Sequence, residues 1–385
     1  MRFSVDAHAI GQHLTGNETY IRNLLRCFAV LDRRAQFVTY FSRPPAEQDL
    51  PDRFVKRRVS VNPFVRLGFD LPRSIRRDRP DLLHVQYTAP LFCPTAVIVS
   101  VHDVSFLEHP EYFTPFRALQ LRCTVRRTIQ LASRVLTPSE FSKRSILAAY
   151  DLDADKVVVL PNGVAQSFRP MAREVAQRAV MQSHRIDAPF ILSVGDLQPR
   201  KNHLGLFRAF EEMVRAHPQL PHHLVVVGKE TWHGAAIRAA AKRSSVASRI
   251  HFTGFVSDDD LLRLYGACEL FVYPSFYEGF GLPILEAMAC GRAVACSNTS
   301  AMVEVADSAA LLFDPHSDQE IALAMRDLLL NPELRLRMER LGTQRAAIFS
   351  WERTAEKTLD LYYEVAGSAR NRAASQQRSA SAVLP

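Results

Sequence analysis

The sequence has few of the features that mark secreted, metal-binding or membrane-spanning proteins. Its 385 residues include only six cysteines, none of them at a C-x-x-C spacing or at the spacing of metal ligands. Such cysteines are typical of free thiols in a reducing compartment and not of a disulfide framework. No apolar run approaches the ~20 residues that a helix needs to cross a bilayer. These absences exclude a disulfide-stapled domain and a membrane-spanning helix.

The amino-terminal segment also lacks the features of a targeting signal. The first ten residues, MRFSVDAHAI, carry Asp6 and His8 and contain no long apolar core. They therefore do not resemble a signal peptide, and we expect a cytoplasmic protein. Hydrophobic residues make up 47% and charged residues 23% of the chain, an ordinary composition for a soluble protein, and the length suffices for two domains.

The net charge of +8 lies entirely in the first half. Residues 1–170 hold 24 of the 48 Lys+Arg and 16 of the 40 Asp+Glu, which leaves 24 of each sign for the rest of the chain. The excess gathers in Pro51–Pro80, where apolar residues interrupt a basic run. The basic residues there are Arg53, Lys56, Arg57, Arg58, Arg66, Arg73, Arg76, Arg77 and Arg79, and the apolar ones are Phe64, Val65, Leu67, Phe69 and Leu71.

This basic segment has two open interpretations. It can dock peripherally on an anionic membrane surface, or it can be a solvated basic face. Nucleic acid is a weaker third partner because no binding motif accompanies the charge, and we expect none.

The chain is organised around residues 269–297. An apolar run, Leu270–Tyr273, predicts a buried strand that ends at Pro274, and a loop containing glycines follows. Pro283 suits the first position of a helix that reaches about Ala289 and stops at Gly291, and Ala293–Cys296 predicts the next strand. Ligands of parallel sheets bind at the carboxyl ends of such strands.

Two carboxylates flank the turn of this unit. Glu278 falls in the loop and Glu286 about one turn inside the helix. Gly279 and Gly281 allow the backbone to approach a ligand, and free amides at the helix start suit an anion. The alternative is a solvated loop with a surface glutamate.

The string E-G-F-G-L-P-I-L-E, from Glu278 to Glu286, closely resembles the E-x7-E signature of glycosyltransferase family 4. The resemblance implies that the first glutamate lies by the donor sugar and that the second holds the nucleotide ribose. It also assigns the neighbouring loop residues to the donor site: Ser275, Gly279, Phe280, Gly281 and Leu282. The implied fold is α/β of the GT-B type, with two doubly wound Rossmann-like domains facing a cleft.

A second cluster of candidates follows the predicted strand Phe190–Val194. Arg200 and Lys201 precede a helix and, next to Gly195, can neutralise a diphosphate, although a surface basic pair is the alternative. The family usually places an arginine just after the glycine, where this chain has Asp196. Lys201 matches the family's lysine, and Arg200 is similar to the arginine of relatives with an R-K-N motif. By position, Gly254, Phe255 and Val256 correspond to the backbone that holds the nucleobase.

The first half contributes candidates of its own. The predicted strand Ala96–Val101 ends in His102-Asp103, where a histidine with its tautomer set by a carboxylate can donate to sugar hydroxyls. It resembles the family's histidine that contacts the donor sugar, while a core histidine is the alternative. Thr15-Gly16-Asn17 predicts the loop and cap that open a helix. In the family the equivalent glycine loop faces the donor diphosphate, and otherwise Gly16 belongs to a plain helix cap.

Alternating strands and helices in two runs predict four segments. Residues 1–165 form an acceptor-binding domain, and residues 166–350 form a donor-binding domain for the nucleotide sugar. Residues 351–366 form a helix that crosses back to the first domain, and residues 367–385, rich in Ser, Ala and Arg, are a disordered tail.

The resemblance implies a retaining transferase that moves a hexosyl or deoxyhexosyl group, with mannosyl favoured, to a glycan or lipid-linked acceptor. The co-substrate is a GDP- or UDP-linked sugar, and we expect no other cofactor. We also expect no metal, because no Asp-x-Asp motif follows a strand and Asp258–Asp260 suit a helix cap. Two alternatives remain: a nucleotide-sugar epimerase of the same fold, and a catalytically silent nucleotide-sugar-binding subunit.

Overall fold

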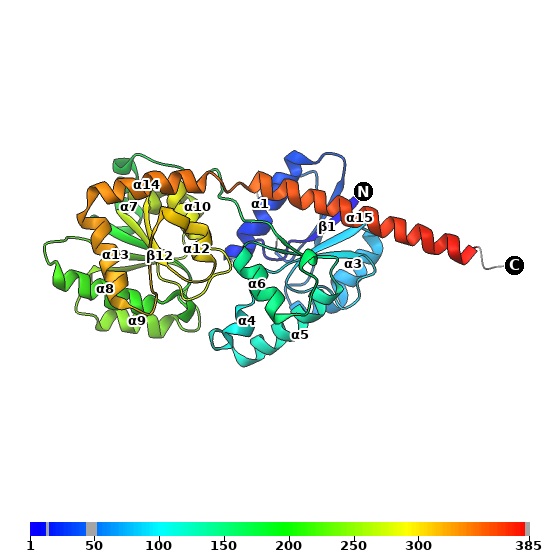
Figure 1. Cartoon of the computed structure of the whole chain (residues 1–385), viewed down its shortest axis with the longest axis horizontal. Coiled ribbons are helices and arrows are strands. Elements are labelled where there is room, and N and C mark those ends of the chain that lie inside the picture. The colour runs from blue at the N-terminus through cyan, green and yellow to red at the C-terminus, as the bar shows by residue number, and fades with distance from the viewer. Residues whose placement is uncertain (13–14, 44–51, 382–385) are drawn as a thin grey trace. The chain divides into compact units, whose positions relative to one another are not determined.

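The computed structural model describes residues 1–12, 15–43 and 52–381 and divides into two compact units. The first unit comprises Met1–Gly163 together with Trp351–Pro385, and the second comprises Val164–Ser350. Figure 1 shows that each unit has a central sheet with helices around it. Pro51 of the basic segment and the last four residues of the predicted tail lie outside the described residues.

The first unit is built on a seven-stranded sheet in the order β3-β2-β1-β4-β5-β6-β7, in which every pairing is parallel. The order reverses between β1 and β4, the place where open α/β sheets bind ligands. The strands are β1 (Arg2–Asp6), β2 (Gln36–Phe41), β3 (Val55–Arg58), β4 (Leu82–Gln86), β5 (Ala96–Ser100), β6 (Arg134–Thr137) and β7 (Val157–Val159).

Helices cover both faces of this sheet. One face packs on α3, α5 and α6 through a buried aliphatic core, and the other packs on α1 and α15 through aromatic rings. The helices are α1 (Thr15–Leu31), α2 (Pro63–Val65), the π-helical turn η1 (Arg66–Asp70), α3 (Leu71–Asp78), α4 (Ser105–Glu108), η2 (Pro110–Tyr112), α5 (Pro115–Leu131), α6 (Glu140–Ala149), η3 (Ala154–Lys156) and α15 (Trp351–Ser381).

The buried Tyr362 is one of the residues that hold helix α15 on the first unit. The Tyr362 ring lies 5.2 Å from Phe3 and 5.5 Å from Phe28, in edge-on contacts that favour aromatic pairs. Its hydroxyl is 2.6 Å from His84 Nδ1, and His84 Nε2 is 2.7 Å from Ser100 Oγ. Because His84 is fully buried, its pKa falls to about 3 and its ring stays neutral. His84 is thus a structural residue of this unit.

The second unit has a six-stranded parallel sheet in the order β10-β9-β8-β11-β12-β13. Here the order reverses between β8 and β11. The strands are β8 (Phe190–Val194), β9 (His223–Val227), β10 (Ile250–Gly254), β11 (Leu270–Tyr273), β12 (Ala293–Ser297) and β13 (Leu311–Phe313).

Alternate side chains of these strands enter two separate cores, as the two-residue period of a strand requires. Phe271 and Tyr273 pack with α7, α10 and α11, whereas Leu270 and Val272 pack with α8 and α13. The helices are α7 (Arg173–His184), η4 (Pro199–Lys201), α8 (His203–Ala216), α9 (Gly234–Arg243), η5 (Ala247–Arg249), α10 (Asp258–Ala267), α11 (Leu282–Ala289), α12 (Ser300–Ala306), η6 (Asp307–Ala309), α13 (Asp318–Leu330) and α14 (Pro332–Ala346).

Two expectations about helix ends need correction. The predicted loop and cap Thr15–Asn17 is already the first turn of α1, and residues 13–14 before it lie outside the described residues. The segment after Gly367 is not irregular, because α15 continues to Ser381. Its many Ala, Arg and Gln residues are good helix formers and no proline interrupts them before Pro385, so low hydrophobicity alone was a poor guide.

The first residues of two helices differ slightly from the prediction. Pro283 occupies the second position of α11, after Leu282, with Gly281 as the cap. Ser257 caps α10 and accepts from the Asp260 amide at 3.1 Å, so the three aspartates form its first turn.

All six cysteines are free. Within the described residues, we find no helix whose length and apolar character would let it cross a membrane.

We predict that Tyr362→Phe destabilises the protein by ~1–3 kcal/mol, because it leaves the buried His84 Nδ1 without a partner. The neighbouring Tyr363→Phe is the control, since its hydroxyl bonds to Asp32 Oδ2 at 2.6 Å in a less buried place. Urea unfolding measures both variants. A Tyr362→Phe protein as stable as the control would contradict this role.

Candidate functional site

The candidate residues of the second unit lie where the strand order of its sheet reverses. Strands β8 and β11 are neighbours, and the loops after their carboxyl ends carry Gly195–Lys201 and Pro274–Gly281. The two loops are bonded together, since the Phe276 amide donates to the Arg200 carbonyl at 2.9 Å. Arg200 and Phe276, 76 positions apart in the chain, therefore share one edge of the sheet.

Lys201 reaches this edge because Gly195 has no side chain. A Cβ atom on Gly195 would lie 3.1–3.2 Å from three carbons of the Lys201 side chain, closer than ordinary contact. The lysine stem thus packs on the bare backbone and is only 9% exposed. The short helical turn η4 ends at Lys201 and directs it back along β8. Gly195 is required here for space and not for an unusual backbone angle.

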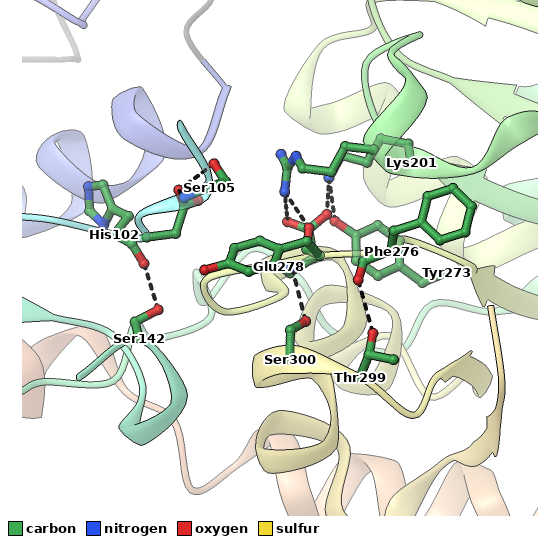
Figure 2. Close-up of polar contacts among 12 residues, drawn as sticks. His102, Ser105, Ser142, Lys201, Tyr273, Phe276, Glu278, Thr299 and Ser300 are labelled. Carbon is green, nitrogen blue, oxygen red and sulfur yellow. Dashed lines mark hydrogen bonds and ion pairs between the residues drawn. The ribbon is translucent and has the colours of Figure 1, made fainter. Parts of the chain in front are cut away.

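Three charges meet at the end of this lysine (Figure 2). Lys201 Nζ lies 2.6 Å from Glu278 Oε1, and Arg200 Nη1 lies 2.8 Å from Glu278 Oε2. Lys201 also donates to the hydroxyl of Tyr273 at 2.6 Å, and Arg200 donates to the Tyr277 carbonyl at 2.7 Å. We call Arg200, Lys201 and Glu278 the ion cluster. It carries one net positive charge and is largely shielded from water.

The electrostatics of the ion cluster keep Glu278 ionised. Burial alone would raise the pKa of Glu278, but the adjacent Arg200 and Lys201 lower it to about 2. Burial lowers the pKa of Lys201, and the Glu278 carboxylate opposes that shift. At neutral pH Glu278 is therefore an acceptor only and cannot deliver a proton.

The Glu278 loop is fixed from below by the start of α12. Ser300 Oγ accepts from the Glu278 amide at 3.0 Å, and Thr299 Oγ1 donates to the Phe276 carbonyl at 3.1 Å. Figure 2 shows both hydroxyls pointing up at the loop. The Phe276 ring also stacks on His316, with centroids 4.8 Å apart. Sequence reasoning missed Ser300 and Thr299, whose role depends on a loop that lies more than 20 residues earlier.

The rest of the signature loop leads into α11. Gly281, at φ 119°, occupies a region that other residues rarely adopt, and it caps the helix. Phe280 is buried against Phe349, with ring centroids 5.8 Å apart. Ser275 is fully buried and Leu282 is partly buried. At the start of α11, Pro283 has no amide hydrogen and the Ile284 amide donates to the Gly281 carbonyl at 3.0 Å, so the Leu282 amide is the one that suits an anionic ligand.

Glu286 lies one turn into α11, in an environment unlike that of Glu278. It is 9% exposed and accepts from the Tyr265 hydroxyl at 3.0 Å. Burial raises its pKa to about 7, the Tyr265 bond opposes this rise, and Asp258 adds to it. One signature glutamate is thus firmly ionised, while the other changes charge near neutrality. No sequence pattern could have predicted that difference, because it comes from the side chains around each group.

Asp196, which stands where the family usually has an arginine, forms an ion pair with a lysine. Lys229 Nζ, from the loop after β9, lies 3.5 Å from Asp196 Oδ2. The Leu197 amide donates to the Lys229 carbonyl at 3.0 Å and fixes the two loops together. The carboxylate that stands where relatives carry an arginine is therefore balanced by a lysine from the neighbouring strand.

Gly254, Phe255 and Val256 follow β10 at the same edge. Gly254 has a positive φ of 75°, and its carbonyl accepts from the Gly228 amide at 3.0 Å. A Cβ on Gly228 would fall 2.0 Å from the Gly195 carbonyl oxygen. Three neighbouring strand ends therefore present glycine backbone in close contact. Phe255 is 51% exposed beside them, and Val256 is partly buried.

The first unit places His102 at the end of β5, next to β4. Its Nε2 lies 3.1 Å from Gln86 Oε1, and its carbonyl accepts from Ser142 Oγ at 2.9 Å (Figure 2). Desolvation lowers the pKa of His102 to about 4, with Asp103 opposing the shift. The expectation of a carboxylate partner for this ring is wrong. Asp103 accepts instead from the Ser105 amide at 3.0 Å and from its hydroxyl at 2.7 Å.

A buried charged group at the end of β1 escaped sequence reasoning. Asp6 is fully buried, with His8 Nδ1 at 3.1 Å and Arg66 Nε at 3.9 Å. Burial would raise the pKa of Asp6, but His8 and Arg66 lower it to about 2. Gly16, by contrast, is exposed inside α1 without a positive φ, so its backbone does not need glycine. The glycine turn that precedes this helix is at Gly11, whose amide donates to Glu18 Oε1 at 3.0 Å.

The comparisons with known proteins agree in class. The family model for glycosyl transferases group 1 matches residues 177–345, and the model for Glycosyltransferase Family 4 matches residues 14–168. Over 265 residues the chain is 31% identical to O-antigen chain mannosyltransferase B of Escherichia coli, covering 69% of each protein.

Two further matches show how much of the chain is similar to known proteins. The chain is 31% identical over 232 residues to serotype-specific mannosyltransferase WbdA of Escherichia coli, covering 60% of this chain but only 28% of that longer protein. The crystal structure of Anabaena Alr3699/HepE in complex with UDP-glucose superposes with a TM-score of 0.75 at 18% identity, covering 94% of this chain and 99% of that one. The fold and the family matches together show that the chain belongs to the group 1 glycosyl transferases of family 4 and is a glycosyltransferase with the two-domain GT-B fold.

Proposed function

We propose that the protein is a retaining glycosyltransferase that uses a nucleotide-diphosphate sugar and no metal ion. It transfers a hexosyl or deoxyhexosyl group, with mannosyl favoured, to a hydroxyl of a glycan or lipid-linked acceptor. The observation that carries the proposal is the ion cluster, where Lys201 Nζ and Arg200 Nη1 lie 2.6 and 2.8 Å from the carboxylate of Glu278. Two cations fixed at one point suit a pyrophosphate group.

The chemistry breaks the bond between the anomeric carbon and the diphosphate oxygen. Negative charge then develops on the leaving diphosphate, and fixed positive groups stabilise it most effectively in a site shielded from water. Lys201 and Arg200 supply these groups, together with the amides near Gly281. The acceptor oxygen forms the new bond on the same face of the sugar, and its proton passes to the leaving phosphate.

Glu278 has a positioning role in this scheme beside the donor sugar. Its low pKa keeps it ionised, so it is neither a general acid nor, while two cations hold it, a free base. It keeps the cation pair in place before the donor binds. On the first unit, His102 and Asp103 remain the proposed contacts for the donor sugar, and His102 acts as a neutral hydrogen-bonding group because its pKa is about 4.

Glu286 is the proposed ligand of the ribose hydroxyls. A carboxylate accepts two hydroxyl hydrogen bonds, and charge-assisted bonds of this kind are the stronger ones. The Tyr265 hydroxyl holds the Glu286 side chain in place by donating to one oxygen. The glycine backbone at Gly254, with Phe255 and Val256, is the proposed contact for the nucleobase.

The identity of the sugar rests on relatives. Both Escherichia coli proteins with 31% identity are named mannosyltransferases, which favours a mannosyl donor linked to GDP. The structural neighbour with UDP-glucose keeps UDP-linked donors in the proposal. We place the enzyme in the cytoplasm with peripheral contact to an anionic membrane, and in the assembly of a surface polysaccharide.

Removal of the Lys201 charge should abolish most turnover. We expect Lys201→Met to lower kcat by about 10²–10³, the usual cost of losing one fixed donor to a developing charge. Arg208→Met is the control, since that arginine is exposed and pairs with Asp318 at the surface. Steady-state kinetics with the best donor, alongside melting temperatures, separate a lost charge from a lost fold. Near-normal turnover by a folded Lys201→Met protein would refute the assignment.

Donor affinity should depend on pH through Glu286. Because its folded pKa is raised from 4.5 to about 7, the carboxyl is neutral below that pH and ionised above it. We expect the Kd of the nucleoside diphosphate to fall roughly tenfold as pH rises through 7, the size of a ~1.4 kcal/mol gain from a charged acceptor. The same raised pKa makes Glu286 stabilise the fold at low pH and lose that contribution as pH rises through 7.

Isothermal titration calorimetry between pH 5.5 and 8.5 measures this dependence in the wild type and in Glu286→Gln. The variant should bind with a nearly flat pH profile. An unchanged inflection in the variant would show that another group titrates.

The function itself is tested by incubating the purified protein with GDP-mannose or UDP-glucose and an oligomannose acceptor in the presence of EDTA. We expect a glycosylated product whose new linkage keeps the donor's anomeric configuration by NMR. Conversion of donor without acceptor would identify an epimerase instead. Transfer that requires added Mg²⁺ or Mn²⁺ would overturn metal independence.

A further inference from the structure

Exposed aromatic side chains are concentrated on one part of the first unit. Among the described residues, four of the five exposed phenylalanines come from three short segments of that unit, and each is 61–68% exposed. They are Phe64 and Phe69 on α2 and η1, Phe92 on the loop after β4, and Phe116 at the start of α5. Single exposed apolar residues are normal on a soluble protein, but a group of them usually marks an interaction site.

Backbone bonds hold these segments side by side. The Leu91 amide donates to the Leu67 carbonyl at 3.0 Å, which joins the loop to η1. The guanidinium of Arg127, on α5, donates to the carbonyls of Pro90 and Leu91, which joins the same loop to α5. Burial lowers the pKa of Arg117 on α5, and the nearby positive charge of Arg66 on η1 lowers it further. The three segments therefore form one continuous surface.

Helical spacing puts apolar side chains and arginines on the same face of α5, and likewise on the same face of the helical segment 63–78. Phe116 and Leu119 are separated by three residues on α5 and share its face with Arg127. Along the helical segment 63–78, Phe69 is followed four and seven residues later by the exposed Arg73 and Arg76. Each face thus presents bulky apolar side chains with arginines beside them.

Arginines predominate on the helical segments that carry these apolar side chains. Helix α5 contains four arginines and no acidic residue, and Arg122 and Arg126 are exposed on it. The two aspartates of the segment 63–78 are engaged with their own unit. Asp70 accepts from the Ser60 amide at 2.7 Å, and Asp78 is buried beside the Tyr40 hydroxyl at 3.3 Å. Exposed arginines of α5 and of the segment 63–78 therefore lie beside the apolar side chains.

We propose that this surface docks on an anionic phospholipid bilayer, with Phe64, Phe69, Leu91, Phe92, Phe116 and Leu119 entering the headgroup region and the surrounding arginines meeting lipid phosphates. Aromatic and aliphatic side chains of this size bind at the boundary between headgroups and acyl chains. Each arginine near an anionic leaflet adds attraction that falls off within a Debye length. The contact is thus broader than the basic segment 53–79 alone, since it includes the loop after β4 and α5.

A second copy of the chain fits this surface poorly. A two-fold contact would place the same patch on both sides and bring Arg73, Arg76, Arg122 and Arg126 against their own copies. Repulsion between like charges opposes such a pair, whereas lipid phosphates neutralise all of them. The charge therefore favours a lipid surface over self-association.

The surface also adjoins the sheet edge that carries His102. Arg66 links the two, since its Nε lies 3.9 Å from Asp6 at the end of β1. The ring of Tyr87, which follows β4, lies 5.7 Å from the His102 ring. A lipid-linked acceptor in the bilayer would find its polar group next to this edge. This choice of acceptor rests on the proposed function, whereas the lipid contact stands without it.

The test is flotation of the purified full-length chain with vesicles of phosphatidylcholine alone and of phosphatidylcholine with phosphatidylglycerol in equal parts. We expect binding to the anionic vesicles, little binding to the neutral ones, and loss of binding in high salt. The variant Phe69→Ser/Phe92→Ser/Phe116→Ser should lower the partition coefficient by at least about tenfold, because three exposed apolar anchors are lost. Arg122→Glu/Arg126→Glu should have an effect of similar size.

Matched controls carry the same kinds of change elsewhere. Val30→Ser/Leu336→Ser/Ile348→Ser removes three apolar side chains that are 54–75% exposed, and Arg337→Glu/Arg340→Glu reverses two exposed arginines of α14. Both controls should bind vesicles like the wild type, and all variants should keep the wild-type melting temperature. Transfer to a soluble oligomannose acceptor should be unchanged in the patch variants, which separates this inference from the proposed function.

Three results would overturn the proposal. Wild-type protein that binds neither kind of vesicle would do so. Patch variants that bind as well as the controls would place the contact elsewhere. A wild-type dimer that the patch substitutions convert to a monomer, without vesicle binding, would assign the surface to a second copy.

Discussion

The pairing of Glu278 with two cations is the interaction on which the rest of the site depends. A buried carboxylate is costly unless it is paired, and a buried lysine would otherwise lose its proton. Together the three groups remain charged inside the protein, with Lys201 Nζ and Arg200 Nη1 at 2.6 and 2.8 Å from the carboxylate oxygens. Other features of the second unit serve this pairing: the bare backbone at Gly195, the hydroxyls of Ser300 and Tyr273, and the bond between the loops after β8 and β11.

The two signature glutamates show how one motif supports two electrostatic states. Glu278 meets cations and is held ionised, whereas Glu286 meets a tyrosine hydroxyl inside an apolar core and titrates near neutrality. Only seven residues lie between them, yet their neighbours come from different elements, η4 for the first and α10 for the second. The same contrast applies to the first unit, where Asp6 is held ionised by His8 and Arg66 while His102 stays neutral beside Gln86.

Much of the fold was predictable because its signals are local. The short apolar run Leu270–Tyr273, which ends before Pro274, forms the buried strand β11 that the sequence predicted. The partners of polar side chains were not predictable, because they depend on which strand ends meet. Asp103 therefore looked like the partner of His102, although Gln86 is 16 residues earlier and takes that place. Low hydrophobicity after Gly367 suggested disorder, whereas helix propensity extends α15 to Ser381.

We expect the ion cluster to bind a pyrophosphate group without the help of a metal. A crystal structure of the protein with GDP or UDP, grown with EDTA, would show where the diphosphate lies. The pyrophosphate oxygens should be within hydrogen-bond distance of Lys201 Nζ and Arg200, with the ribose hydroxyls at Glu286. A diphosphate bound away from Lys201, or one that binds only when an added divalent cation bridges it to the protein, would show that the ion cluster does not have this role.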